Sequence, residues 1–136
     1  MLDQAIAELR RRNEPVPLPW RLPTSSEVEA MEVALGVRFP DDYRRFLLEA
    51  SDVVLGTLVP ATITNASDYT YLPAVVASAR DYGVPAHLFP ICEDNADFYC
   101  LAPSGEIVFW SHNGATDDRW PSLAHWLLQV WLGERA

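Results

Sequence analysis

Three carboxylates, Glu93, Asp94 and Asp97, crowd a short polar segment between two apolar runs. Paired carboxylates can do general acid–base chemistry when one of them is buried and its pKa is raised. A calcium loop would need acidic or amide residues at alternating positions and then a glycine. Residues 93–98 have neither that alternation nor the glycine. The cluster therefore predicts a solvated surface turn rather than a catalytic or metal site.

The histidines do not form a metal site, because His87, His112 and His125 lie far apart and none has a spacing such as H-E-x-x-H. We expect each to be neutral and structural. His112 is the most open to another role, since it ends a predicted strand and faces the acidic segment 116–119. The chain has no G-x-S-x-G elbow and no glycine-rich phosphate loop. The sequence predicts a protein that is not an enzyme and that needs no cofactor.

Cys92 and Cys100 lie on the two apolar runs around the acidic cluster. A cross-strand disulfide is geometrically conceivable, whereas a reducing compartment favours two buried thiols. No Cys-x-x-Cys pair occurs, which excludes a zinc ribbon and a thioredoxin-like redox pair. We expect buried thiols, and whether they ever pair stays open.

The chain of 136 residues is acidic, with a formal net charge of −9. Residues 51–136 carry most of it, with three arginines against ten acids. This balance argues against nucleic-acid binding, which needs a cationic surface. The same field attracts a basic protein, although net acidity also simply keeps a protein in solution. No apolar run can span a bilayer and the N-terminus lacks the order of a signal peptide, so we expect a cytoplasmic protein.

Tryptophan is concentrated near the C-terminus, where Trp110, Trp120, Trp126 and Trp131 supply four of the five in the chain. Trp126 and Trp131 are five residues apart, which is about 140° around an α-helix. Both cannot then be fully buried on one side. Either one is an exposed interface anchor rimmed by acids, or the helix has a wide buried face.

Hydrophobic periodicity and turn residues place the elements that must position these side chains. Predicted helices cover residues 2–12, 24–36, 40–51, 72–83 and 119–134, and predicted strands cover residues 88–92, 97–102 and 106–111. Residues 53–63 are predicted to form one or two strands broken near Pro60. Thr24 and Glu27 have capping-box spacing, Gly36 is a helix stop, and the prolines of residues 14–23 favour an extended linker. Helices first, an antiparallel sheet and a last helix indicate the α+β class.

Two blocks of sequence follow the pattern of a known family. The first, "EVEAMEVALGVRFPDDYRRFLLEAS", is similar to the opening signature of the SMI1/KNR4 (SUKH) superfamily. The matching residues are Glu29, Leu35, Gly36, Phe39, Pro40, Tyr43, Phe46 and Leu47. "FPICEDNADFYCLAPSGEIVFWSHNG" resembles its strand–turn–strand block, and "SLAHWLLQVW" resembles its closing helix. The resemblance covers roughly residues 24–133.

The chain departs from the family pattern at three loops. "SDVVLG" stands where the family usually has N-G-G, Ala96 stands where glycine is common, and Pro103 stands where aspartate is common. These loops lie near the proposed binding face, so the departures bear on partner identity more than on fold.

The resemblance implies a twisted antiparallel sheet packed against flanking helices. Bacterial members of the family are regarded as immunity proteins that neutralise toxins, and the fungal namesake is a regulatory interaction protein connected with cell-wall synthesis. Neither is known for catalysis. We therefore expect a bacterial immunity-type protein that occludes the active site of a basic toxin, for example a nuclease, with a regulatory scaffold as the alternative.

We expect one domain over residues 1–136, in which residues 1–23 are a helix and linker and residues 24–133 the family-like core. The predicted partner surface consists of acidic residues and two aromatic anchors. Its residues are Glu93, Asp94, Asp97, Asp117, Asp118, Trp110 and Tyr71. The sequence leaves the oligomeric state open.

Overall fold

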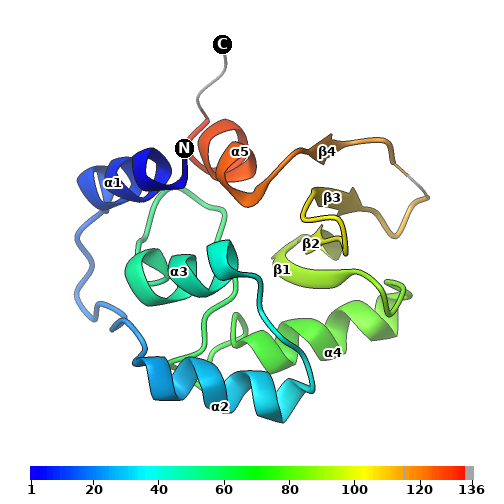
Figure 1. Ribbon diagram of the computed structural model, residues 1–136, viewed down its shortest axis with the longest axis horizontal. Coiled ribbons are helices and arrows are strands. Elements are labelled where there is room, and N and C mark those ends of the chain that lie inside the picture. The colour runs from blue at the N-terminus through cyan, green and yellow to red at the C-terminus, as the bar shows by residue number, and fades with distance from the viewer. Residues whose placement is uncertain (115, 134–136) are drawn as a thin grey trace.

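The computed structural model describes residues 1–114 and 116–133 of the chain (Figure 1). Its helices are α1 (Leu2–Arg12), α2 (Ser25–Leu35), α3 (Asp41–Ala50), α4 (Leu72–Tyr82), α5 (Leu123–Trp126) and the π-helical turn η1 (Leu127–Trp131). Its strands are β1 (Phe89–Asp94), β2 (Asp97–Leu101), β3 (Ile107–Trp110) and β4 (Arg119–Trp120). The succession of elements confirms the predicted α+β class.

Both ends of α2 follow the local signals in the sequence. The Thr24 hydroxyl accepts a hydrogen bond from the Glu27 N–H at 3.2 Å, and the Glu27 carboxylate accepts one from the Thr24 N–H at 2.9 Å. This capping box satisfies N–H groups that have no partner within the helix. Gly36 ends the helix at φ 66°, a left-handed conformation that costs glycine little.

The sheet is an antiparallel meander in the order β1-β2-β3-β4. Its first three strands confirm the prediction. The short β4 lies where the closing helix was predicted to begin, and that helix starts instead at Leu123. The prediction of one or two strands over residues 53–63 is wrong, because this segment makes only two isolated bridges, Pro60 to Cys92 and Thr62 to Tyr71. Pro60 lacks the N–H that a continuous ladder beside β1 would need at this position.

Helices cover the sheet on both faces. On one face, Tyr82 of α4 packs against Phe98 of β2, with ring centroids 6.1 Å apart. On the other, Trp126 of α5 packs against Tyr99 of β2 at 5.2 Å. Successive residues of a strand point to opposite faces, so these contacts place α4 and α5 on opposite sides of the sheet (Figure 1).

An aromatic cluster joins α3 to the sheet and to the closing helix. Tyr43 packs edge-on against Phe39 at 5.2 Å and against Phe89 at 6.4 Å. Phe46, one turn further along α3, meets the ring of Trp131 at 6.1 Å. Edge-to-face aromatic pairs add to the stabilisation that their buried area gives.

The closing helix buries both of its tryptophans. Trp126 is 1% exposed and Trp131 is 7% exposed, so of the two alternatives left by their spacing the wide buried face is the one observed. One reason is that the helix changes from α to π, and the Leu132 N–H bonds the Leu127 carbonyl at 2.8 Å. This wider turn reduces the angle about the helix axis between residues five apart. The other is that Trp126 faces β2 while Trp131 faces α3.

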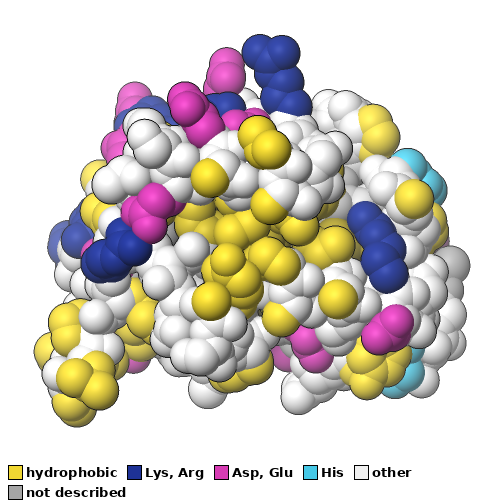
Figure 2. Space-filling view, turned by 90° about the horizontal axis from the view of Figure 1, so that it is seen from below, with side chains coloured by type: hydrophobic (Ala, Val, Ile, Leu, Met, Phe, Trp, Pro, Cys, Tyr) yellow, Lys and Arg dark blue, Asp and Glu magenta, His cyan; other side chains and the backbone are white. Residues whose placement is uncertain are grey.

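The face on the side of α2 and α4 is not uniformly acidic, although the chain has a net charge of −9. Figure 2 shows this face from below, with apolar side chains gathered in a central hollow. Side chains of both charge signs stand around that hollow (Figure 2). The acidity of the chain is therefore not spread evenly over its surface.

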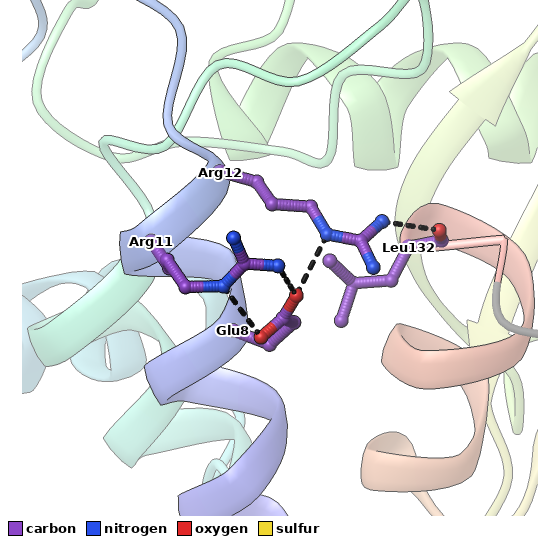
Figure 3. A network of polar contacts seen from close by, with 4 residues as sticks. All are labelled: Glu8, Arg11, Arg12 and Leu132. Atoms are coloured by element: carbon purple, nitrogen blue, oxygen red, sulfur yellow. Dashed lines mark hydrogen bonds and ion pairs between the residues drawn. The ribbon is translucent and has the colours of Figure 1, made fainter.

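The N-terminal helix is tied to the end of the closing helix. Leu9 is fully buried in the same hydrophobic core as α3 and the sheet. Arg12 donates to Glu8 at 2.8 Å and to the Leu132 carbonyl at 3.0 Å (Figure 3). Hydrogen bonds from Arg11 and then Arg12 lower the pKa of Glu8 to about 2. The first and last helices thus pack as parts of one core.

A buried carboxylate fixes the corner between α2 and α3. Glu32 is 9% exposed and accepts a hydrogen bond from the Phe39 N–H at 2.7 Å. Its second oxygen pairs with the Arg44 guanidinium of α3. The Val37 N–H also bonds the Glu32 carbonyl, at 3.1 Å. These bonds fold residues 37–40 back over the end of α2 and set Phe39 into the aromatic cluster.

We expect Glu32→Gln to lower the free energy of unfolding by about 1–3 kcal/mol, because an amide keeps the size but cannot accept both charge-assisted bonds. Urea denaturation followed by tryptophan fluorescence measures this. Glu29→Gln, on the exposed side of the same helix, is the matched control and should stay within about 0.5 kcal/mol of the wild type. Equal stability of the two variants would contradict the role given to Glu32.

Candidate functional site

The acidic hairpin, defined by Glu93, Asp94 and Asp97, lies at the tight turn between β1 and β2. Asp94 is paired with Asp97 across the turn. Asn95 and Ala96 form the turn with φ values of 52° and 69°. Two successive positive φ values match the twist of a hairpin, and asparagine tolerates them better than alanine does. The predicted surface turn is confirmed.

The register of the hairpin separates its carboxylates between two faces. Glu93 lies opposite Phe98, on the side of the sheet that α4 covers. Asp94 and Asp97 lie opposite each other, on the face that also carries Tyr99. The three acids therefore border the end of the sheet from both sides.

Tyr99 lies within electrostatic range of three predicted acids, and it was not among the residues predicted from the sequence. Burial raises the pKa of Tyr99 to about 12, and the negative charges of Asp94, Asp118 and Asp97 contribute to the rise. Its ring packs against Phe109 at 4.9 Å. The alternation of apolar and polar residues in β2 does not reveal this proximity, which depends on the β3–β4 connection folding back.

Asp97 is partly engaged within the molecule. Its Oδ1 lies 2.8 Å from Nδ1 of His112 and accepts the His112 backbone N–H at 3.1 Å. Partial burial opposes ionisation of Asp97, but the hydrogen bonds from His112 and Ser111 outweigh it and hold its pKa below the ordinary value. The sequence predicted that His112 faces residues 116–119, whereas in the structure its hydrogen-bond partner is Asp97.

A hollow of about 320 Å³, the hairpin hollow, opens beside the turn. It is lined by Glu93, Asp94, Asn95, residues 57–59 and Tyr69. Tyr69 is 75% exposed, which makes it an aromatic side chain that a partner can reach. Tyr71, the tyrosine predicted from the sequence, is half-buried against the core and begins α4. The two tyrosines differ in exposure because Tyr71 caps the start of α4, whereas Tyr69 lies in the loop before it.

The remaining predicted residues lie along β3 and the segment that follows it. Trp110 is half-buried, and its ring packs against Phe98 at 6.3 Å. Asp117 and Asp118 are exposed, and the Asp118 carbonyl accepts the Phe109 N–H at 3.0 Å. Asp118 is thus beside Phe109, the partner of Tyr99 in the sheet, while Trp110 is only partly exposed.

The comparisons with known proteins agree with this architecture. A family model described as SMI1-KNR4 cell-wall, SUKH_5, matches residues 2–132. The chain belongs to the SMI1/KNR4 (SUKH) family. Domains of this family are generally protein-interacting and non-catalytic, and the family is known as an immunity-type domain. The match includes α1, so it extends further toward the N-terminus than the motifs noticed in the sequence.

This SUKH domain is also similar to a solved structure described as "Crystal structure of protein from Pseudomonas syringae pv. tomato". The two share 42% sequence identity over 97% of this chain and 99% of the other, with a TM-score of 0.92. A search of curated proteins found no match.

The chemistry of the SUKH domain is limited by where its reactive groups lie. Cys92 and Cys100 are buried free thiols; burial raises the pKa of both, that of Cys100 to about 12. Such thiols stay protonated at neutral pH and are poor nucleophiles. Within residues 1–114 and 116–133, no three His, Cys, Asp or Glu side chains are grouped to hold a metal ion. None of the described helices is long and apolar enough to cross a bilayer.

We expect Asp97→Asn to lower the free energy of unfolding by less than about 1 kcal/mol at neutral pH, because the pair is partly solvated. A carboxylate with a lowered pKa stabilises the fold above its unfolded pKa, so this difference should narrow below about pH 4. Thermal unfolding from pH 7 to pH 3 measures it. Asp117→Asn, at an exposed position, is the control. A stability difference between the wild type and Asp97→Asn that stays constant with pH would contradict the role given to the Asp97 carboxylate.

Proposed function

We propose that this SUKH domain is an immunity-type binding protein of the cytoplasm. It neutralises a cognate toxin by covering a basic active-site cleft, as in a nuclease. Membership of the family supports a non-catalytic, protein-binding role. The observation that carries the proposal is the gathering of carboxylates at the turn end of the sheet beside the hairpin hollow.

The proposed surface combines the acidic hairpin with residues near it. Asp94 and Asp97 lie opposite each other across the turn, and Asp118 lies beside β3, where its carbonyl accepts the Phe109 N–H. A cleft that binds nucleic acid presents arginine and lysine to phosphates. Carboxylates at fixed positions on a folded turn can take the place of those phosphates. Trp110, Asp117 and Tyr71 stay in the proposed surface, although Trp110 and Tyr71 are partly buried.

The hairpin hollow suits the side chain of an arginine or lysine from the partner. Glu93 and Asp94 supply carboxylates, and the exposed ring of Tyr69 stands at the same hollow. A guanidinium can form charge-assisted hydrogen bonds to carboxylates and stack on an aromatic ring. The hollow would therefore serve as the anchor point of the interface.

The alternative is a regulatory scaffold with a partner encoded by the host. The description of the matched family as SMI1-KNR4 cell-wall favours it. The arrangement of genes distinguishes the two functions. A toxin gene next to the gene for this protein supports immunity, and an isolated gene supports regulation.

The first test is capture of the partner by the immobilised protein at low and then high salt. We expect a basic toxin domain that salt elutes and whose toxicity is relieved when the two proteins are expressed together. A housekeeping protein with no toxicity would instead establish the regulatory function.

With the partner in hand, we expect Glu93→Arg to slow association by about tenfold or more at low salt, because reversed charge removes electrostatic steering. The effect should shrink as salt is raised. Surface plasmon resonance measures both rates. Glu29→Arg changes the net charge equally from an exposed position on α2 and is the control. Equal association rates for the two variants would show that the acidic hairpin is only solvated surface.

We expect Tyr69→Ala to weaken binding by about tenfold, which corresponds to ~1.4 kcal/mol, while thermal stability stays unchanged. The side chain is exposed, so its removal leaves no cavity. Leu18→Ala, an exposed apolar position in the linker, is the control in the same calorimetric titration. Unchanged affinity of the Tyr69 variant would remove the hairpin hollow from the interface.

A further inference from the structure

A second surface of the domain has the opposite charge from the acidic hairpin. It is a groove of about 460 Å³, the basic groove, between the α2–α3 corner, the end of α4, the start of β1 and the β2–β3 turn. Its apolar walls include Val37, Phe39, Phe89 and Leu101. This volume is in the range of about 300–1,000 Å³ typical of ligand sites. It shares no lining residue with the hairpin hollow.

The charged side chains of the basic groove, Arg38 and Arg80, are both positive. Arg38, Arg80 and His87 line it, and no Asp or Glu is among its lining residues. The protein as a whole has a net charge of −9. A cationic lining with no acid, in a chain this acidic, gives the groove charge complementarity to an anionic partner.

Arg38 has no role in holding the fold together. It is exposed and, within residues 1–114 and 116–133, makes no hydrogen bond and no ion pair. Other arginines in the same half of the chain do pair with acids: Arg21 is bound to Glu27, and Arg44 is bound to Glu32. Arg38 lies at the rim of an apolar groove without a bonded partner among the described residues, and on its other side it borders a hollow that Glu29 and Glu32 also line.

Arg80 differs from Arg38, because it connects the end of α4 to the loop that follows. Its Nη1 donates to the carbonyls of Val84, Pro85 and Leu88, at 3.2, 2.8 and 2.9 Å. These acceptors are neutral, so the positive charge of Arg80 is positioned by them without being cancelled. The guanidinium is thus fixed beside the groove with its charge available to a ligand.

We propose that the basic groove binds an acidic segment of a partner protein in which carboxylates flank a bulky apolar side chain. The apolar side chain lies on Val37, Phe39, Phe89 and Leu101, and the carboxylates pair with Arg38 and Arg80. An extended chain supplies both kinds of group at once, which matches the mixture of apolar walls and cationic rim. The proposal is independent of the immunity function, because it concerns a different surface and a partner of the opposite charge.

The test uses the full chain and a fluorescein-labelled synthetic peptide in which two glutamates stand on each side of a phenylalanine. Fluorescence anisotropy at low salt should show saturable binding. A peptide with glutamine in place of every glutamate, and one with glycine in place of the phenylalanine, should each bind at least about fivefold more weakly. No saturation below about 1 mM would overturn the proposal.

The variants locate the site. Arg38→Gln should weaken binding by about fivefold without changing the thermal unfolding temperature, because Arg38 makes no bond in the fold. Arg119→Gln removes the same charge from an exposed position on β4 and should leave the affinity unchanged. Equal losses of peptide affinity in the two variants would show a non-specific effect of charge. That result would overturn the proposal that the peptide binds in the basic groove.

Two further readouts distinguish the basic groove from the acidic hairpin and from a site for small anions. In ¹H–¹⁵N spectra of the full chain, the peptide should shift the amides of residues 37–39, 101–102 and 104–105 and leave those of residues 93–95 in place. Shifts confined to residues 93–95 would overturn the proposal. Citrate at millimolar concentration should not displace the peptide; full displacement would show that a small anion is the ligand and would overturn the choice of a protein segment.

Discussion

The carboxylate of Glu32 determines how the helical half of the molecule meets the sheet. A buried charge is costly unless it is paired and hydrogen-bonded, and Glu32 has both kinds of partner in Arg44 and the Phe39 N–H. These bonds join α2, the corner that follows it and α3. The corner in turn holds Phe39 against Tyr43 and Phe89, and so packs α3 against the first strand. One side chain thus links the orientation of two helices to the aromatic core.

The same corner contributes to one of two surfaces that differ in charge. Residues 37–40 form one wall of the basic groove, while the β1–β2 turn carries the acidic hairpin at another part of the sheet. A net charge is a sum over the chain and does not say how charge is distributed. The structure separates the charges because a tight hairpin gathers neighbours in sequence, whereas Arg38 and Arg80 come from distant segments that the fold brings to the same groove. The domain therefore presents two surfaces whose charged side chains differ in sign.

The candidate site shows where sequence reasoning succeeded and where it ended. The acids of the hairpin were predicted because they are adjacent in sequence, and the positive φ values at Asn95 and Ala96 keep them together. Tyr69 was missed in favour of Tyr71, because only the packing of α4 decides which tyrosine is exposed. Tyr99 was missed because its neighbours come from β1 and the β3–β4 connection. Spacing along one strand does not contain that information.

The sequence by itself determined the class of fold, the capped start and glycine stop of α2, three strands and the acidic turn. Each of these depends on neighbouring residues, through side-chain capping, backbone conformation or periodicity. Only the tertiary structure decided that residues 53–63 are not a strand and that Trp126 and Trp131 are both buried. It also decided that Arg38, among the residues described, stays without a partner. These outcomes depend on which distant segments pack together, and burial and pairing free energies between distant residues are not encoded in local spacing.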